Sequence, residues 1–155
     1  MQQADVLQGI EIMRDKLPEN RLRQHLETCA LEYGCPAGKN FFLARYEAPL
    51  PTSRACNARC LGCISLQSDK QLTSSQNRIA FTPNAGEIAA VALTHIGRVK
   101  RAVVSFGQGC EGDPLMAGRE IEAAIRLIRD RTSEGTINLN TNASLPDVLA
   151  PLLDA

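Results

Sequence analysis

The chain has 155 residues, of which 17 are Lys or Arg and 17 are Asp or Glu, so its formal net charge at pH 7 is zero. This balance gives no electrostatic reason to expect a nucleic-acid backbone or an anionic membrane as the partner. Aromatic residues make up only 4% of the chain and Trp is absent, which argues against a stacking surface for single-stranded nucleic acid. With 44% hydrophobic and 22% charged residues, the composition is that of one folded domain.

The first forty residues predict two helices. Apolar residues recur at helical spacing over residues 2–17, and Pro18 interrupts the pattern. A second helical stripe covers residues 20–32, and a Gly and a Pro follow it. We therefore expect residues 1–40 to form an N-terminal helical extension in front of the rest of the chain.

The sequence predicts neither a membrane segment nor a secretory signal. The longest aliphatic run, residues 88–93, is far shorter than the roughly 20 apolar residues that a transmembrane helix needs. The first thirty residues carry scattered charges and no apolar segment of the kind that secretory signals contain. We therefore expect no membrane partner and a cytoplasmic location. In a reducing cytosol, the six cysteines are expected to be metal ligands or buried thiols rather than disulfides.

The remaining chain alternates predicted strands and helices. A β-prone segment at residues 41–47 runs into a loop that begins with prolines and contains three cysteines. Beyond this loop, the pattern continues as helix, strand, helix, strand and helix. The predicted elements are a helix that starts at Thr82-Pro83, a strand at 101–106, a helix at 117–131, a strand at 137–140 and a helix that starts near Leu145.

Strands that alternate with helices of about ten to fifteen residues favour parallel βα units with right-handed crossovers. The predicted fold class is therefore α/β, built from parallel βα repeats. Ligands of such folds bind at the carboxyl ends of the strands. Three unusual segments are expected to converge there: the cysteine loop, a Gly-rich turn at 107–114 and the Thr141-Asn142 pair.

The loop after the first predicted strand carries the pattern Cys-x3-Cys-x2-Cys, formed by Cys56, Cys60 and Cys63. A structural zinc site would use four protein ligands, and neither histidine of the chain lies near this loop in the sequence. A cluster of four irons, by contrast, is able to take three cysteines and leave its fourth iron free for a substrate or cofactor. The spacing favours such a [4Fe-4S] cluster.

This motif after a first β-strand resembles the signature of the radical S-adenosylmethionine (radical SAM) superfamily. The resemblance implies that Cys56, Cys60 and Cys63 hold a [4Fe-4S] cluster whose free iron chelates the amino and carboxylate groups of S-adenosylmethionine. It implies an enzyme that cleaves this cofactor to methionine and a 5′-deoxyadenosyl radical, which takes hydrogen from a substrate that the sequence does not identify. The expected partner is an electron donor such as reduced flavodoxin or ferredoxin.

The turn after the next predicted strand carries a second resemblance. Where the superfamily has Gly-Gly-Glu-Pro, this chain has Glu111-Gly112-Asp113-Pro114, which implies acceptors for the ammonium group of the cofactor. An alternative that stays open is that Asp113 caps the following helix. Gly62 precedes the third cysteine, where members commonly have an aromatic residue against the adenine. After the third predicted strand, Asn140-Thr141-Asn142 is similar to the Thr-Asn-Gly of many members. The implied cofactor-binding residues are Gly62, Glu111, Gly112, Asp113, Asn140 and Asn142.

The resemblance covers residues 41–155 and implies the front half of a larger core. Members typically have six βα units in a partial TIM-like barrel, whereas about three are predicted here. We therefore expect a truncated radical SAM core at 41–155, an incomplete TIM-like barrel, behind the helical extension at 1–40. Such a chain is expected to hold a cluster without completing turnover.

A non-catalytic metal-binding module is the alternative, in which Cys29 or Cys35 completes a zinc or iron–sulfur site with the three loop cysteines. Against a metal role, Cys29 lies on the apolar stripe of a predicted helix, where a buried free cysteine is common. The sulfur of Cys110 is not expected to be a ligand. His25 and His95 fall on predicted helices without partners nearby in the sequence, which favours surface or packing roles.

Overall fold

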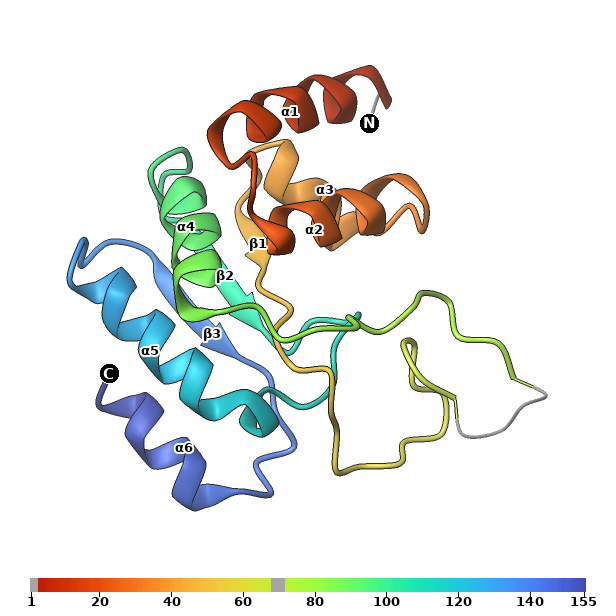
Figure 1. The fold of residues 1–155 in the computed structure, drawn as a ribbon, viewed down its shortest axis with the longest axis vertical. Helices are drawn as coiled ribbons and strands as arrows, with labels where there is room; N and C mark the ends of the chain where they lie inside the picture. Colours follow the sequence, from red (N-terminus) through yellow and green to blue (C-terminus); the bar gives the residue numbers. More distant parts are fainter. Residues whose placement is uncertain (1–2, 68–71) are drawn as a thin grey trace.

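The computed structural model describes residues 3–67 and 72–155 (Figure 1). Within these residues the fold is α/β, as predicted: three parallel strands form one sheet, and six α-helices and one short 3₁₀ helix pack around it. In chain order the elements are α1 (Gln3–Lys16), α2 (Arg21–Leu31), α3 (Pro36–Phe42), β1 (Glu47–Pro49), α4 (Ala85–Ile96), β2 (Val103–Phe106), the 3₁₀ helix η1 (Pro114–Ala117), α5 (Gly118–Arg129), β3 (Thr136–Leu139) and α6 (Pro146–Leu153).

The sheet has the order β1-β2-β3, with β2 in the centre. Both pairs are parallel, and Val104 of β2 lies opposite Ala48 on one side and Ile137 on the other. All four residues of β2 are buried, which is typical of a central parallel strand. Pro49 ends β1, and it is tolerated there because β1 is an edge strand.

The strand predicted at residues 41–47 is wrong in its position. Residues 41 and 42 end helix α3, and the strand begins only at Glu47. Pro36 begins α3 at its first turn, which is a favoured position for proline. Phe41 and Phe42 are fully buried, with their rings 5.2 Å apart in an edge-to-face contact. This packing outweighs the β preference of aromatic residues. Residue 40, where we expected the helical extension to end, lies inside α3.

Helix α4 begins two residues later than predicted because Asn84, rather than Thr82, caps it. The Asn84 side chain accepts a hydrogen bond from the Glu87 N–H, and the Glu87 carboxylate accepts one from the Asn84 N–H, which forms a capping box. The same carboxylate accepts two hydrogen bonds of 2.7 Å from the Arg21 guanidinium. The Asn20 amide also donates to the Glu87 carbonyl. The starts of α2 and α4 are therefore fixed to each other.

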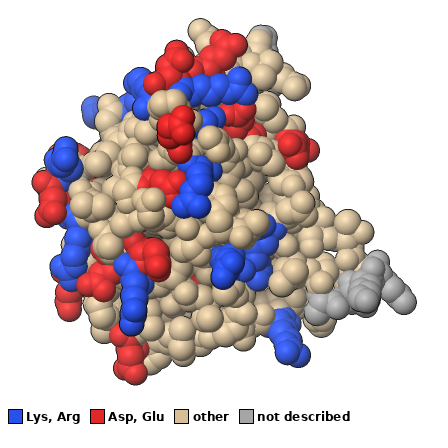
Figure 2. All heavy atoms as spheres, viewed as in Figure 1, with Lys and Arg blue, Asp and Glu red and all other residues tan. Residues whose placement is uncertain are grey.

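One continuous hydrophobic core joins the N-terminal helices to the sheet and its helices. Fully buried members come from α1, α3, α4, β2 and α5; they include Ile10, Phe42, Ile88, Val104 and Ile121. None of the helices within the described residues is long and apolar enough to cross a bilayer. On the face drawn in Figure 2, basic and acidic side chains are intermingled, without a large patch of one sign, as the balanced composition leads one to expect.

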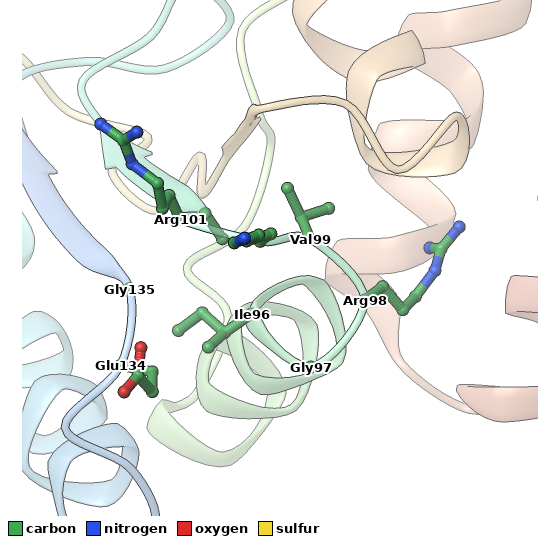
Figure 3. A pocket seen from close by; sticks show the side chains of 9 residues that line it. Ile96, Gly97, Arg98, Val99, Arg101, Glu134 and Gly135 are labelled. Carbon is green, nitrogen blue, oxygen red and sulfur yellow. The ribbon is translucent and has the colours of Figure 1, made fainter.

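A cavity of about 380 Å³ lies at the amino-terminal end of β2 and β3 (Figure 3). It is lined by the turn after α4 and by the residues that precede β3. Two arginines belong to it, but the Arg98 guanidinium donates to the carbonyls of Phe41 and Phe42, both at 3.2 Å, and points away from Arg101. Lys100 and the acidic Glu134 also line the cavity, and because its two arginines diverge, it is no evident anion site. The features predicted to bind ligands lie at the opposite end of the strands.

Candidate functional site

Three loops meet at the carboxyl ends of the strands, as the parallel order predicted. The loop after β1 is bound to the turn after β2 through its backbone: the Gly112 N–H donates to the Ser53 carbonyl at 2.6 Å, and the Asp113 N–H donates to the Ala55 carbonyl at 3.0 Å. The loop after β1 also reaches the loop after β3, because the Asn142 amide donates to the Asn57 side-chain oxygen at 2.9 Å. The cysteine loop is thus attached at its base to both neighbours.

Two glycines allow these loops to approach so closely. A Cβ atom at Gly112 would lie 1.8 Å from the Ala55 carbonyl oxygen, and one at Gly107 would lie 1.8 Å from the Asn140 carbonyl oxygen. Gly107 also has φ +78°, a conformation that favours glycine. Every larger residue would push the loops apart at these two positions.

The Glu111 side chain anchors the start of the cysteine loop. Its carboxylate is buried and accepts hydrogen bonds from the backbone N–H groups of Thr52 at 2.9 Å, Ser53 at 3.0 Å and Gly107 at 2.6 Å. Burial raises the pKa of Glu111 to about 7, although these N–H groups act to lower it. The carboxylate is therefore engaged by this chain's own backbone, and a contact from Glu111 to a cofactor stays a prediction.

Asp113 joins the turn after β2 to the loop after β3. Its carboxylate accepts hydrogen bonds from the Thr141 hydroxyl at 2.7 Å and from the Asn142 N–H at 2.8 Å. It also accepts one from the Leu115 N–H at 3.0 Å and so caps η1. The capping role left open for Asp113 is confirmed, and its predicted contact with a cofactor ammonium group would come in addition to these bonds.

The other predicted cofactor-binding residues lie on the same three loops. The Asn140 amide donates to the Phe106 carbonyl at 3.1 Å, while Asn142 contacts Asn57 of the cysteine loop. Gly62 has φ +77°, and no atom lies within 4 Å of the position its Cβ would take. Gly62 therefore allows the positive φ angle at this point of the loop. It also leaves empty the space that a larger side chain would fill.

The three loop cysteines differ in exposure but are all accessible. Cys60 is exposed, and Cys56 and Cys63 are half-buried. Leu61, next to Cys60, is 94% exposed. Among the described residues, these three cysteines do not form a group gathered closely enough to hold a single ion. Cysteines of an iron–sulfur cluster bind different irons, so their sulfurs lie further apart than those around one ion.

The surroundings of Cys63 lower the pKa of its thiol. The Arg78 guanidinium lies 3.6 Å from its sulfur, and the Ser65 hydroxyl lies 3.7 Å away. Burial raises the pKa of Cys63, but hydrogen bonds from the Ser65 and Leu66 backbones, the Ser65 hydroxyl and Arg78 outweigh it and lower the pKa to about 7. A large part of this thiol is therefore ionised near neutral pH, and the thiolate is the form that binds metals.

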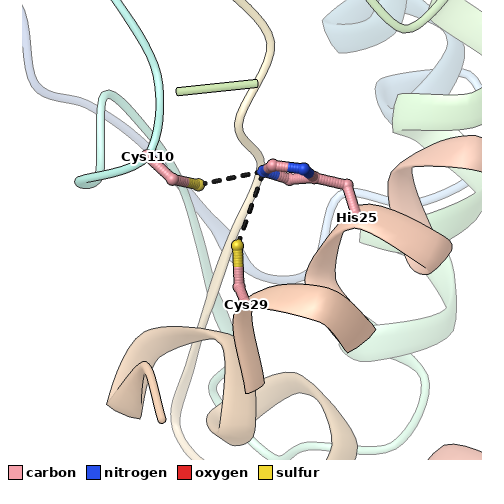
Figure 4. Close-up of side chains that lie close together, drawn as sticks. All are labelled: His25, Cys29 and Cys110. Carbon is pink, nitrogen blue, oxygen red and sulfur yellow. Dashed lines mark hydrogen bonds between the residues drawn. The ribbon is translucent and has the colours of Figure 1, made fainter. Parts of the chain in front are cut away.

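A second group of side chains of metal-ligating types, which the sequence did not predict, contains none of the loop cysteines (Figure 4). His25 Nε2 lies 3.2 Å from Cys110 Sγ and 3.5 Å from Cys29 Sγ. The three ligand atoms all lie within 4.8 Å of one another. Hydrogen bonds from Cys110 and His25 lower the pKa of Cys29 against the effect of burial, and the pKa of Cys110 is raised in turn.

The sequence held one local signal for this group. His25 and Cys29 are four residues apart on α2, so they lie on the same side of the helix. Cys110 comes from the turn after β2, and its arrival beside α2 depends on the packing of the N-terminal helices against the sheet. No local pattern reveals such a contact. Comparisons with known proteins add nothing to either group, because no family model, curated protein or solved structure matches the chain.

Proposed function

We propose that the chain is a radical SAM enzyme core, in which Cys56, Cys60 and Cys63 bind a [4Fe-4S] cluster and the three carboxyl-end loops bind S-adenosylmethionine. The observation that carries the proposal is the position of the Cys-x3-Cys-x2-Cys loop. It follows the first strand of a parallel sheet and is hydrogen-bonded to the two loops that would meet the cofactor. We place the described βα units in a partial TIM-like barrel on the same grounds.

The donor set fits such a cluster. Three soft thiolate ligands come from one loop, the pKa of one of them is about 7, and none of them forms a disulfide. When bound, the cluster and S-adenosylmethionine would together supply one-electron cleavage of the sulfonium group. The chain's own part is positioning: Glu111 and Asp113 fix the three loops to one another.

The remaining parts of the proposal concern partners. A one-electron reductant is required for this chemistry, and we propose a small carrier such as reduced flavodoxin or ferredoxin. A cytoplasmic location follows as part of the same proposal, because the free thiols and the cluster need a reducing compartment. The substrate is left open, since no described residue identifies it.

The alternative of a metal site shared by Cys29 and the loop cysteines is less favoured. The Cys29 sulfur lies beside His25 Nε2 and within 4.8 Å of Cys110 Sγ, and none of the loop cysteines belongs to that group. Cys29 would have to leave a buried position to complete a site in the loop.

Anaerobic reconstitution with iron and sulfide tests the proposal. We expect about four irons per chain and, after reduction, an electron paramagnetic resonance signal that changes when S-adenosylmethionine is added. A Cys60→Ser variant should lose the cluster, while the matched Cys35→Ser variant, which removes a thiol outside the loop, should keep it. A loop that takes up zinc but no iron–sulfur cluster, or a cluster that persists in Cys60→Ser, would contradict the proposal.

A further inference from the structure

We propose that His25, Cys29 and Cys110 form a separate binding site for a single thiophilic divalent ion such as Zn²⁺, with three protein ligands and a fourth position open to a small molecule or water. This site is independent of the cysteine loop and shares no ligand with it.

The two distances from His25 are close to those around one tetrahedral ion, and the two sulfurs lie within 4.8 Å of each other. With Zn–S bonds of about 2.3 Å and Zn–N bonds of about 2.0–2.1 Å, neighbouring ligands around tetrahedral zinc lie about 3.5–3.8 Å apart. His25 Nε2 lies 3.2 Å from Cys110 Sγ and 3.5 Å from Cys29 Sγ. The contact with Cys29 already lies in this range, and a small outward movement of the Cys110 side chain would bring the other contact into it. Figure 4 shows both sulfurs directed at the same ring nitrogen.

The charges also fit. Zn²⁺ bound by two thiolates and a neutral imidazole forms a complex with no net charge, and two thiol protons leave when the ion binds. Cys29 is 1% and Cys110 is 3% exposed, and a neutral complex is what a buried position tolerates best. Soft sulfur and imidazole ligands select Zn²⁺ over Mg²⁺ or Ca²⁺, which prefer oxygen.

The ligands are held by the fold before any ion arrives. His25 and Cys29 lie on one side of α2, and the His25 ring packs edge-on against Phe81, with 6.3 Å between ring centroids. Cys110 is fixed through its carbonyl, which accepts a hydrogen bond of 2.7 Å from the Ile79 N–H. A site whose ligands are ordered in advance loses little conformational entropy when it binds.

No described side chain is assigned to the fourth position. A cavity of about 560 Å³ is lined by Gly109, which precedes Cys110, and by Cys35 at the start of α3. None of the three ligands lines this cavity, and the Cys35 sulfur does not belong to their group, so we assign three protein ligands and leave the fourth place to water or a small molecule. Three protein ligands with an open position are the arrangement typical of zinc sites that bind a substrate or water.

The test uses the full chain with Cys56, Cys60 and Cys63 all replaced by Ser, so that the loop does not compete for metal. After treatment with a chelator under anaerobic conditions, the protein is titrated with Zn²⁺ and, for its visible spectrum, with Co²⁺. We expect one ion per chain and Co²⁺ absorption bands from two thiolates in tetrahedral coordination. In this background, Cys110→Ser or His25→Ala should weaken binding by more than about 100-fold, beyond the 10–100-fold typical of outer partners of a site.

Cys35→Ser is the matched control and should leave the affinity unchanged. Circular dichroism of each metal-free variant shows whether it is folded, and among folded variants only those with the three ligands should melt at a higher temperature when Zn²⁺ is added. A folded parent that binds no Zn²⁺, or binding that survives the loss of His25 or Cys110, would overturn the site. A loss of affinity in Cys35→Ser equal to that in Cys110→Ser would overturn the three-ligand form.

Discussion

The two thiol-rich regions of the molecule contrast in almost every physical respect. The cysteine loop has its three thiols within eight residues of irregular backbone, with Cys60 exposed and Leu61 94% exposed beside it. The group of His25, Cys29 and Cys110 draws its members from a helix and a distant turn and buries both sulfurs. The thiols of the cysteine loop are close in sequence, and a bound cluster would bring them together. The side chains of His25, Cys29 and Cys110 are already brought together by the fold.

This contrast shows that closeness in sequence and closeness in space describe different sites. Ligands that share a loop are able to rearrange around a multi-iron cluster because only their anchors are fixed. Ligands that come from packed elements offer one geometry, which suits a single ion. Four measurements test whether the two regions differ in this way.

The largest difference should appear in thiol reactivity. In the reduced, metal-free chain, we expect iodoacetamide to alkylate Cys60 at least about 100-fold faster than Cys29 or Cys110, because the buried thiols react only when the structure opens. Mass spectrometry of peptides over time measures the rates, and in denaturant all of them should converge. Equal rates for Cys60 and Cys110 in the folded chain would show that the buried group is open to solvent.

Replacement of Gly112 by Ala should be among the most damaging single changes in the loops. Its new Cβ would stand 1.8 Å from the Ala55 carbonyl oxygen, and we expect a loss of about 3 kcal/mol or more in the free energy of unfolding. Gly62→Ala is the matched control: its φ is +77° but its surroundings are open, so only about 1 kcal/mol of backbone strain is expected. Urea denaturation compares the two, and similar losses would mean that the loops are not in close contact.

Glu111→Gln should lower the free energy of unfolding by about 1–3 kcal/mol. The NH2 group of the new amide would point at backbone N–H groups that now donate to the carboxylate. The pKa of Glu111 is raised from 4.5 to about 7, so the folded chain binds the proton more tightly than the unfolded chain. The contribution of Glu111 to stability is therefore fully present below pH 4.5 and decreases as the pH rises to about 7.

The variant should lack this part of the pH dependence. Urea denaturation of the wild-type protein and of Glu111→Gln at pH 5 and pH 8 measures this. The difference in unfolding free energy between the two proteins should be smaller at pH 8 than at pH 5. A difference that grows with pH would mean that the three N–H groups, rather than burial, dominate the pKa of Glu111.

The smallest effect is expected from Asn57→Ala, which removes the bonds from the cysteine loop to Asn142 and Ser144. These groups are exposed, so we expect a loss of about 1 kcal/mol or less. Hydrogen exchange is the more sensitive measurement: the amides of residues 141–144 should exchange faster, whereas those of β2 should not change. Unchanged exchange at 141–144 would show that the Asp113 bonds alone fix this loop.

The sequence predicted most of the fold because its signals were local. The alternation of apolar stripes and short strands predicted α1, α2, α4, α5 and the parallel order, and the glycines and Asp113 marked the turns. The error at residues 41–47 had a non-local cause, since Phe41 and Phe42 are helical only because the core receives both rings. The group of His25, Cys29 and Cys110 was missed for the same reason, as Cys110 meets α2 from 81 residues beyond Cys29 in the sequence.

The Glu87 carboxylate, bound both by the first turn of α4 and by Arg21 of α2, has a consequence for proteolysis. Residues 45 and 46, between α3 and β1, are exposed, so a protease that cleaves after Arg45 would leave two polypeptides. These would not separate, because the Arg21–Glu87 ion pair and the shared hydrophobic core both join them. They would behave like the two subunits of an obligate heterodimer. The nicked protein would elute as one species in its native state and as two in denaturant.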